Sequence, residues 1–425
     1  MPERRTISVL VVGSGLAGLT AAHLLHNDKR QRYDVTIFEQ GPVPSLSSAS
    51  LSTPSGPIDI PMRSFTASYY PHLSRVLQYL HLPVRPEPFL FSFPSYSHPS
   101  RLASLPPRPS HRSWPQHIRL LAALAFAYAY FIFTCFFLPP SDSEDFGQWM
   151  KRVRLPGWFV GEYILPLMAA VATCDHAELL AFPAKDVVGY KRVTNGEPHV
   201  VVADGVGALQ RQLLEGGKAG AVKIELNRRV HRIQGAVQGP KVVTYLEDGA
   251  EVTGVYDKVV LAVTPDVVGG IYAPLKEKMS RIPTKKVEVV AIREEGREGE
   301  IILRSKGGET EARHCARGLV TVTGPLTAIG DGKSGASTPS EPSSGASSGA
   351  STPSQEESKV IRRSVFTRVL RSVESRQVVK SLEKSNGDDG VFVVGGWCWD
   401  GMVLLEGCVR SAEGVARKLG VEVPW

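Results

Sequence analysis

At 425 residues the chain is long enough for two domains, and shares of 42% hydrophobic and 21% charged residues exclude a disordered or fibrous protein. The net charge of +7 comes from basic residues dispersed along the chain, which excludes nucleic acid as an expected partner. Five scattered cysteines without metal-ligand spacing predict free thiols, a reducing compartment and no metal site. Because the N-terminus runs directly into a predicted strand, we expect no signal peptide and a cytoplasmic location.

The first forty residues predict a nucleotide-binding unit. An apolar strand at residues 7–12 is followed by a glycine-rich turn, a helix from residue 19 to about residue 27, and a second strand at residues 34–38. The turn has the pattern G-x-G-x-x-G and consists of Gly13, Ser14, Gly15, Leu16, Ala17 and Gly18.

The three glycines of this turn have different expected roles. Gly13 permits the tight turn, Gly15 lets a pyrophosphate approach the backbone, and Gly18 lets the helix pack close to the strand. The free N–H groups at the helix N-terminus then point at the phosphates. The second strand ends in Glu39, followed by Gln40, at the place where an acid can accept hydrogen bonds from a ribose diol.

Two segments further along depart from ordinary globular sequence. Residues 120–138 are nineteen residues without a charge, bounded by Arg119 and by two prolines, which makes them a marginal candidate for a membrane-spanning helix. Residues 331–358 are almost entirely Ser, Gly, Ala, Thr, Pro and Glu, and cannot bury enough apolar surface to offset the entropy lost on ordering. We expect this second segment to be a disordered insertion in a surface loop.

The C-terminal residues predict a second strand–turn–helix. A strand at residues 391–394 leads into the turn at 395–401, which reads Gly-Gly-Trp-Cys-Trp-Asp-Gly, and then into a helix at 402–419. That helix carries Leu404-Leu405-Glu406-Gly407-Cys408-Val409 near its start. With these residues the chain resembles the flavoprotein superfamily of flavin-containing amine oxidases, protoporphyrinogen oxidases and phytoene desaturases, whose last helix carries an E-G-A/C-V-x-S/A element.

Two further stretches extend the resemblance. Arg229 and Val230 after a short strand at residues 222–226, and the strand and turn at 256–265, are similar to the segments by which those proteins return to the cofactor domain. Residues 58–82 and 158–182 resemble a branch of predicted NAD/FAD-binding proteins of bacteria and fungi. At residues 46–51 the chain lacks the G-G-R-type phosphate loop of the superfamily, so no contact is carried over there.

The resemblance implies an α/β fold, in which an FAD-binding Rossmann-like domain of the glutathione-reductase type is interleaved with an α+β substrate domain. The expected FAD-binding domain comprises residues 1–70, 196–270 and 386–425, and the substrate domain comprises 71–195 and 271–385. The expected cofactor is FAD. The residues that the resemblance assigns to it are the six of the glycine turn together with Glu39, Gln40, Arg63, Val230, Gly396, Leu404 and Leu405.

The apolar segment at residues 120–138 has two interpretations under this scheme. A single membrane crossing would separate the two ends of the chain, and one FAD needs both of them. We therefore expect peripheral or monotopic contact with an intracellular membrane or, alternatively, a buried wall of an apolar substrate pocket. Both interpretations favour a hydrophobic substrate.

The resemblance implies an FAD-dependent oxidoreductase that acts as an oxidase, dehydrogenase or desaturase on a hydrophobic small molecule of lipid or secondary metabolism. Cys398, Trp399 and Leu404 are expected to face the substrate. The catalytic residues and the electron acceptor are not assigned, with dioxygen as one candidate acceptor, because the flavin itself carries the redox chemistry.

Three alternatives stay open. Amine oxidation is disfavoured because Leu404 occupies an aromatic-cage position of amine oxidases, and because Lys285 and Lys286 do not match the local sequence around their flavin-facing lysine. An NAD(P)-dependent dehydrogenase would share the first forty residues without needing the C-terminal element. A non-catalytic flavin-binding protein would keep both.

Overall fold

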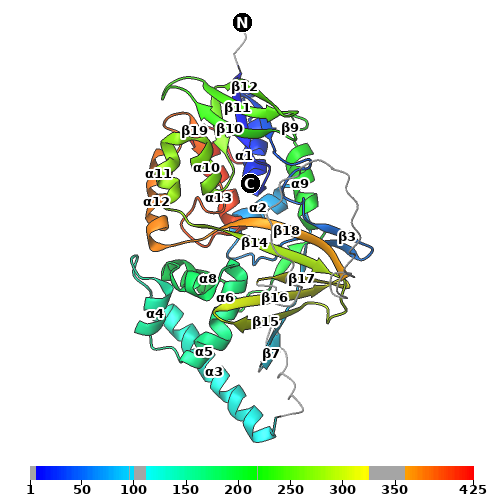
Figure 1. The fold of residues 1–425 in the computed structure, drawn as a ribbon, viewed down its shortest axis with the longest axis vertical. Coiled ribbons are helices and arrows are strands. Elements are labelled where there is room, and N and C mark those ends of the chain that lie inside the picture. Colours follow the sequence, from blue (N-terminus) through cyan, green and yellow to red (C-terminus); the bar gives the residue numbers. More distant parts are fainter. Residues whose placement is uncertain (1–5, 95, 100–111, 218, 325–358) are drawn as a thin grey trace, which may run out of the picture.

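The computed structural model describes residues 6–94, 96–99, 112–217, 219–324 and 359–425, so the insertion expected at 331–358 lies outside the described residues. The molecule has two parts (Figure 1). One contains a parallel sheet flanked by helices and the other a mixed sheet with helices beside it. This arrangement confirms the predicted fold class.

The parallel sheet has five strands drawn from distant parts of the chain. In order across the sheet they are β19 (Val391–Val393), β13 (Lys258–Leu261), β1 (Ile7–Val12), β2 (Tyr33–Phe38) and β9 (Lys223–Glu225), and every neighbouring pair is parallel. Because both faces of such a sheet are covered, its strands are apolar throughout. Along β1, Val9 and Val11 enter one core and Leu10 and Val12 the other.

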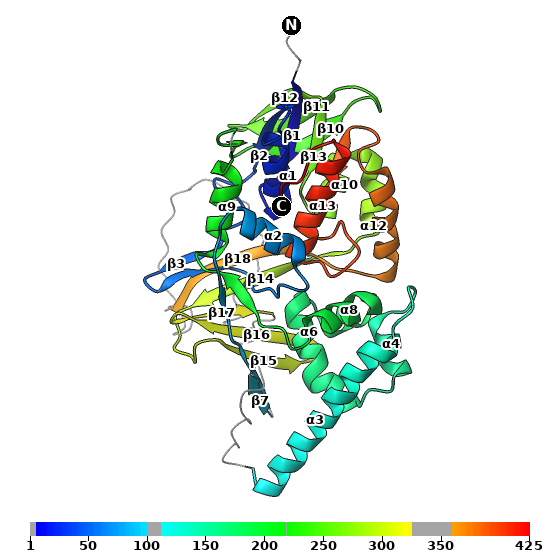
Figure 2. The same ribbon diagram turned by 180° about the vertical axis from the view of Figure 1, so that it is seen from behind.

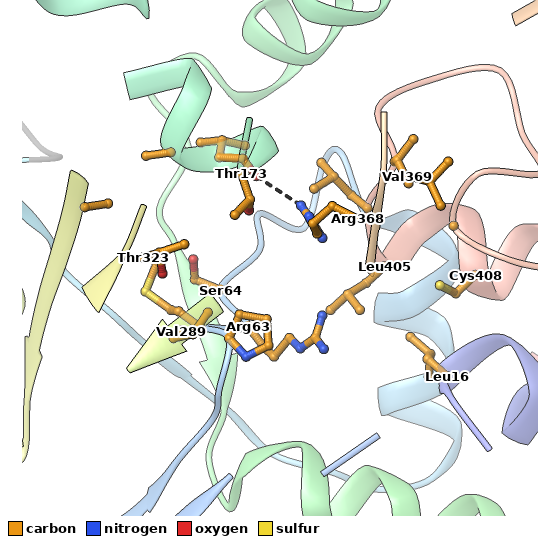
Figure 3. Close-up of a pocket in the computed structure, with 18 of the residues that line it drawn as sticks. Leu16, Arg63, Ser64, Thr173, Val289, Thr323, Arg368, Val369, Leu405 and Cys408 are labelled. Atoms are coloured by element: carbon orange, nitrogen blue, oxygen red, sulfur yellow. Dashed lines mark hydrogen bonds between the residues drawn. The ribbon is translucent and has the colours of Figure 1, made fainter. Parts of the chain in front are cut away.

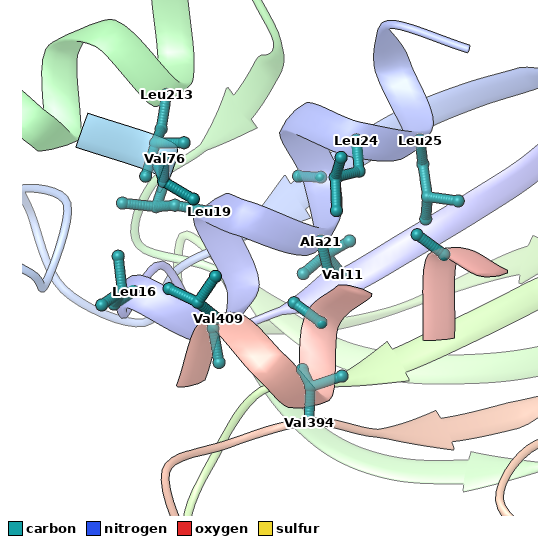
Figure 4. Close-up of a cluster of buried hydrophobic side chains, with 14 of the residues drawn as sticks. Val11, Leu16, Leu19, Ala21, Leu24, Leu25, Val76, Leu213, Val394 and Val409 are labelled. Atoms are coloured by element: carbon teal, nitrogen blue, oxygen red, sulfur yellow. The ribbon is translucent and has the colours of Figure 1, made fainter. Parts of the chain in front are cut away.

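Helices cover both faces of this sheet. On one face lie α1 (Leu16–His26), α2 (Pro71–Tyr79), α9 (Gly205–Glu215) and α13 (Leu405–Lys418). On the other lie α10 (Pro265–Ile271), the 3₁₀ turn η2 (Ala273–Leu275), α11 (Lys276–Ser280), α12 (Val373–Ser385) and an antiparallel sheet of β10 (Arg229–Gln234), β11 (Lys241–Glu247) and β12 (Ala250–Tyr256). Figure 4 shows α1 at the centre of the first core, with Leu19 between side chains of the neighbouring helices.

Three helices pack differently from the predicted domain boundaries. Those boundaries assign α2, α11 and α12 to the substrate domain. In the structure Val76 of α2, Met279 of α11 and Val379 of α12 are all buried in the two cores beside the parallel sheet. The apolar faces of these helices, rather than their place in the sequence, determine which domain they join.

The second sheet has seven strands. Their order is β18 (Val360–Val369), β14 (Thr284–Ile292), β17 (Leu319–Thr323), β16 (Glu309–Ala316), β15 (Glu300–Lys306), β6 (Leu90–Phe93) and β7 (Tyr96–Pro99), with only β15 and β6 parallel. The helices beside it are α4 (Phe146–Arg152), α5 (Gly157–Phe159), the π-helix η1 (Val160–Ile164), α6 (Leu165–Ala172), α7 (His176–Leu180) and α8 (Ala184–Thr194). Two short pairs complete the fold, β3 (Leu51–Thr53) with β4 (Gly56–Ile58) and β5 (Val84–Pro86) with β8 (Val200–Val202).

The apolar segment forms the long helix α3 (Trp114–Phe137), which extends away from the body (Figures 1 and 2). It begins before the predicted segment because Ser113 and Gln116 form a capping box at its N-terminus. One face is anchored, with the Tyr130 hydroxyl donating to the Val153 carbonyl over 2.8 Å. By length and composition alone α3 could cross a membrane, since an 18-residue window has a mean hydropathy of 2.1 with 28% of the window buried.

Helix α13 approaches two other backbone segments closely. The buried carboxylate of Glu406 accepts the backbone N–H groups of His72 and Leu73, each at 3.1 Å, and so caps the N-terminus of α2. At the next position a Cβ on Gly407 would overlap the Trp399 ring and lie 2.6 Å from the Gly396 carbonyl oxygen. The E-G pair therefore holds α13 against both α2 and the turn that precedes it.

We expect Gly407→Ala to lower the free energy of unfolding by about 1–3 kcal/mol, because the added methyl group must displace the Trp399 ring or the Gly396 backbone. Gly414→Ala, in the same helix, is the matched control. Its Cβ would meet nothing within 4 Å, so it should raise the free energy of unfolding by about 0.5–1 kcal/mol. Urea unfolding measures both, and a Gly407→Ala protein of wild-type stability would contradict the close approach.

Candidate active site

The glycine turn combines two crowded positions with one open position. Gly13 has φ +99°, and a Cβ there would lie 2.8 Å from the Ala262 carbonyl oxygen. A Cβ on Gly18 would overlap the Gly13 carbonyl oxygen. Gly15 has φ −68° and ψ 174°, and a Cβ there would meet nothing within 4 Å. The protein itself thus requires glycine at positions 13 and 18, whereas at position 15 it leaves an open approach to the backbone.

The Glu39 carboxylate stabilises this turn by accepting hydrogen bonds from it. The sequence did not predict this role. Its Oε2 accepts the backbone N–H of Ser14 at 3.1 Å and the Ser14 hydroxyl at 2.5 Å. Its Oε1 accepts the N–H of Gly41 at 2.9 Å. A carboxylate has further lone pairs, so the ribose contact stays a prediction. The Arg228 N–H donates to the Glu39 carbonyl, which brings the start of β10 alongside.

A cavity of about 380 Å³ lies between the parallel sheet and the seven-stranded sheet. Seven of the predicted cofactor residues line it, namely Gly15, Leu16, Ala17, Arg63, Gly396, Leu404 and Leu405. The other six, Gly13, Ser14, Gly18, Glu39, Gln40 and Val230, are not among the described lining residues. Of these six, Val230 is buried in β10 and Gln40 is exposed at the end of β2.

Two helices begin at this cavity. The residues that precede them, Gly15 before α1 and Leu404 before α13, both line it. Neither has a side chain able to accept a hydrogen bond from the first turn. Helix N-termini of this kind carry unpaired N–H groups and a partial positive charge, and they bind anionic or carbonyl groups of ligands.

Only one of the three expected substrate-facing residues lies on the cavity. Leu404 lines it, whereas Cys398 and Trp399 do not belong to its described lining. The Trp399 indole N–H donates to the Met402 carbonyl over 2.8 Å, and the ring packs on Gly407, so this side chain supports the turn. Trp397, which the sequence also places in the turn expected nearest the flavin ring, lines the cavity, and its indole N–H donates to the Val263 carbonyl over 3.2 Å. Burial raises the pKa of the Cys398 thiol well above its ordinary value.

Two arginines point into the cavity from different sides, Arg63 near Leu405 and Arg368 beside Thr173 (Figure 3). The Nε atom of each is buried without a hydrogen-bond partner, and neither forms an ion pair with a described residue. Burial lowers the pKa of both, and together with repulsion by Arg63 it brings the pKa of Arg368 to about 10, so the guanidinium stays charged at neutral pH. Arg368 was not predicted from the sequence.

The remaining ionisable groups of the lining are neutral at neutral pH. His199 and His314 pack on Phe89 with ring centroids at 5.3 and 5.8 Å, and burial lowers the pKa of both, to about 4 for His314. Burial raises the pKa of Tyr190 to about 12. The described lining contains no Asp or Glu. The cavity is therefore a positively charged space with largely apolar walls.

Lys285 lies elsewhere. Its ammonium group pairs with Asp175 at 3.0 Å and Glu178 at 2.9 Å, and it is not among the described lining residues. These two ion pairs hold β14 against α7.

Comparisons with known proteins support the fold. Residues 11–80 match the model of the NAD(P)-binding Rossmann-like domain. A search of curated proteins found no significant match.

Solved structures match over nearly the whole chain. One is described as a protoporphyrinogen oxidase from Exiguobacterium sp. 255-15, with 16% identity and a TM-score of 0.61 over 99% of this chain and 100% of the other. Cyclohexylamine oxidase from Brevibacterium oxydans IH-35A has 14% identity and a TM-score of 0.61 over 98% and 100%. The CLA-producing fatty acid isomerase from P. acnes has 14% identity and a TM-score of 0.63 over 97% and 98%. The chain thus contains an NAD(P)-binding Rossmann-like domain within the same two-domain fold as these three proteins.

Proposed function

We propose that this protein is an FAD-dependent oxidoreductase that acts on a hydrophobic small molecule. The observation that carries the proposal is the convergence of α1 and α13, from opposite ends of the chain, on one cavity. Gly15 supplies an open approach for the pyrophosphate, and the amides at Leu404 and Leu405 supply donors for the flavin ring. Glu39 and Gln40 would hold the ribose, Val230 the adenine end, and Arg63 the anionic part of the cofactor.

FAD explains this arrangement better than NAD(P). A dehydrogenase that bound only a nicotinamide cofactor would need the glycine turn but not a second helix N-terminus at the same cavity. Residues at positions 395, 396, 404 and 405 all line the space that Gly15 faces. The cavity has the volume typical of ligand sites, and its lining extends from the two helix N-termini to the seven-stranded sheet, which offers a wall for a substrate and so favours an enzyme over a non-catalytic flavin-binding protein.

When bound, the flavin supplies the hydride or electron acceptor, and dioxygen or another acceptor would reoxidise it. The chain's own residues would exclude water and orient the substrate. Apolar side chains from the seven-stranded sheet form much of the wall, including Phe91, Val289, Ile301 and Leu303. Amine oxidation is the less favoured alternative, because the described lining has no Asp or Glu to pair with an ammonium group and the Arg368 guanidinium repels one.

The cofactor assignment is tested by Gly15→Val. Any residue can adopt the backbone conformation of Gly15, and a side chain there would meet open space. The variant should therefore fold normally, while its valine side chain blocks the approach of the pyrophosphate. The wild-type protein should purify with flavin absorption bands near ~375 and ~450 nm, and the variant should lose at least about 90% of them. Gly270→Ala is the control, because it also adds a side chain in open space, in α10, and should keep its flavin. A folded Gly15→Val protein with full flavin content would refute the assignment.

We also propose that α3 makes peripheral or monotopic contact with an intracellular membrane from the cytoplasmic side. Apolar side chains are exposed along the helix, with Phe126 at 74%, Phe137 at 68% and Ile118 at 59% exposure. The alternative, a wall of the substrate pocket, is not supported, because no residue of α3 is among the described lining residues. A membrane surface would bury these aromatic and aliphatic groups.

Sedimentation of the full-length protein with liposomes tests this contact. The double substitution Phe126→Asp and Phe137→Asp should reduce the bound fraction at least about tenfold, because charges replace the groups that enter the lipid. Val237→Asp changes an equally exposed side chain, at 70%, outside α3 and should bind like wild type. Equal sedimentation of all three proteins would contradict the membrane contact without affecting the cofactor assignment.

A further inference from the structure

We propose that Arg368 is a substrate-binding residue that pairs with a carboxylate, so that the substrate is a hydrophobic carboxylic acid. This inference deepens the proposed function and rests on the cavity being the substrate site. It depends on the isolation of the guanidinium, its position in the fold and the apolar walls around it.

Arg368 is charged and deep in the protein, and no acidic side chain of the described residues pairs with it. Its Nη2 reaches only the carbonyl oxygens of Val171 and Ala172, at 3.5 and 3.3 Å, which are long hydrogen bonds. Its Nε has no partner. An unpaired buried cation is costly, so it is expected where a ligand completes the pairing.

Arg368 belongs to a different part of the fold from the predicted cofactor residues, although it shares the cavity with Arg63. It lies on β18, in the sheet of the substrate domain, and its neighbours Thr367 and Val369 also line the cavity. The two carbonyls that hold it belong to the last turn of α6, whose partial negative charge orients the guanidinium. Arg63 instead lies in the segment between β4 and α2, and α2 packs in the cofactor domain. Its side chain faces Leu405 (Figure 3). We therefore assign Arg63 to the cofactor and Arg368 to the substrate.

A carboxylate is the ligand group that fits this site. The planar guanidinium fork presents paired N–H donors that match the two oxygens of a carboxylate. Thr173 lies beside Arg368 on the cavity and adds a hydroxyl that can complete such a site. The walls beyond these groups are largely aliphatic and aromatic, with a few hydroxyl groups such as those of Ser64 and Thr323, which suits the body of a fatty-acid-like molecule rather than a small polar acid.

Titration calorimetry on the full-length protein as purified tests the proposal with three ten-carbon probes, decanoate, 1-decanol and decylammonium. Wild type should bind decanoate roughly 10- to 100-fold more tightly than 1-decanol, and decylammonium most weakly. Arg368→Met should lose this preference while its affinity for 1-decanol changes less than about threefold. Arg368→Lys should keep part of the preference for decanoate, because the positive charge remains but the paired N–H donors of the guanidinium are lost.

A stability measurement separates this role from a structural one. Replacing an unpaired buried cation by an apolar side chain of similar length should leave the melting temperature of Arg368→Met unchanged or higher. Arg363→Gln is the matched control on the same strand, since Arg363 is 43% exposed and faces Glu288 at 3.6 Å. This control should retain the decanoate preference.

Two results would overturn the proposal. One is equal affinity of wild type for decanoate and 1-decanol, and the other is loss of bound flavin in Arg368→Met, which would assign this arginine to the cofactor. Flavin content is read separately from the absorption spectrum. A protein without flavin that still prefers decanoate through Arg368 would refute the proposed redox function and leave the carboxylate site standing.

Discussion

The cavity lies where the two ends of the chain meet, because the side chains of α1 and α13 pack together in the core beside the parallel sheet. A Cβ on Gly18 would overlap the Gly13 carbonyl oxygen, and a Cβ on Gly407 would overlap the Trp399 ring. These contacts shape the turn at each end of the chain, and the packing of α1 against α13 brings the N-termini of both helices to the same space. Because the first and last parts of the chain meet in the cofactor domain, the chain between them leaves this domain and returns to it. The segments that lie outside the cofactor domain form the substrate domain.

Several other buried charges among the described residues are paired, unlike the two cavity arginines. Glu406 binds the first N–H groups of α2, and Glu413 pairs with His72 at 2.9 Å and Arg417 at 2.7 Å. Arg376 pairs with Asp186 at 3.2 Å, and Arg371 donates to the Trp399 and Gly401 carbonyls at 2.9 and 3.0 Å, which fixes the turn before α13. The same fold that satisfies these groups leaves Arg63 and Arg368 facing the cavity. Arg63 and Arg368 differ from these paired groups because neither has an acidic partner among the described residues while both face the cavity.

The substrate domain carries apolar surface in two separate places. Inside, the seven-stranded sheet contributes aliphatic and aromatic side chains to the cavity. Outside, α3 exposes aromatic side chains while Phe131 and Cys135 on its other face are buried against the helices of the same domain. A helix anchored along one face and apolar on the other is suited to lie in a membrane surface. The proposed membrane contact would concentrate the proposed hydrophobic acid near the cavity, because such an acid partitions into the same membrane.

The sequence by itself determined the cofactor-binding framework, because each part of it is encoded by contiguous residues. The turn at positions 13–18, the strand ending in Glu39 and the E-G pair at 406–407 are local patterns whose geometry follows from glycine, alternation and helix periodicity. Only the tertiary structure decided that Ser14 and Gly41 bind the Glu39 carboxylate, that Trp397 rather than Cys398 or Trp399 lines the cavity, and that α2 and α12 join the cofactor domain. It alone placed Arg368 opposite Arg63, since residues about three hundred positions apart meet through packing that no local pattern specifies.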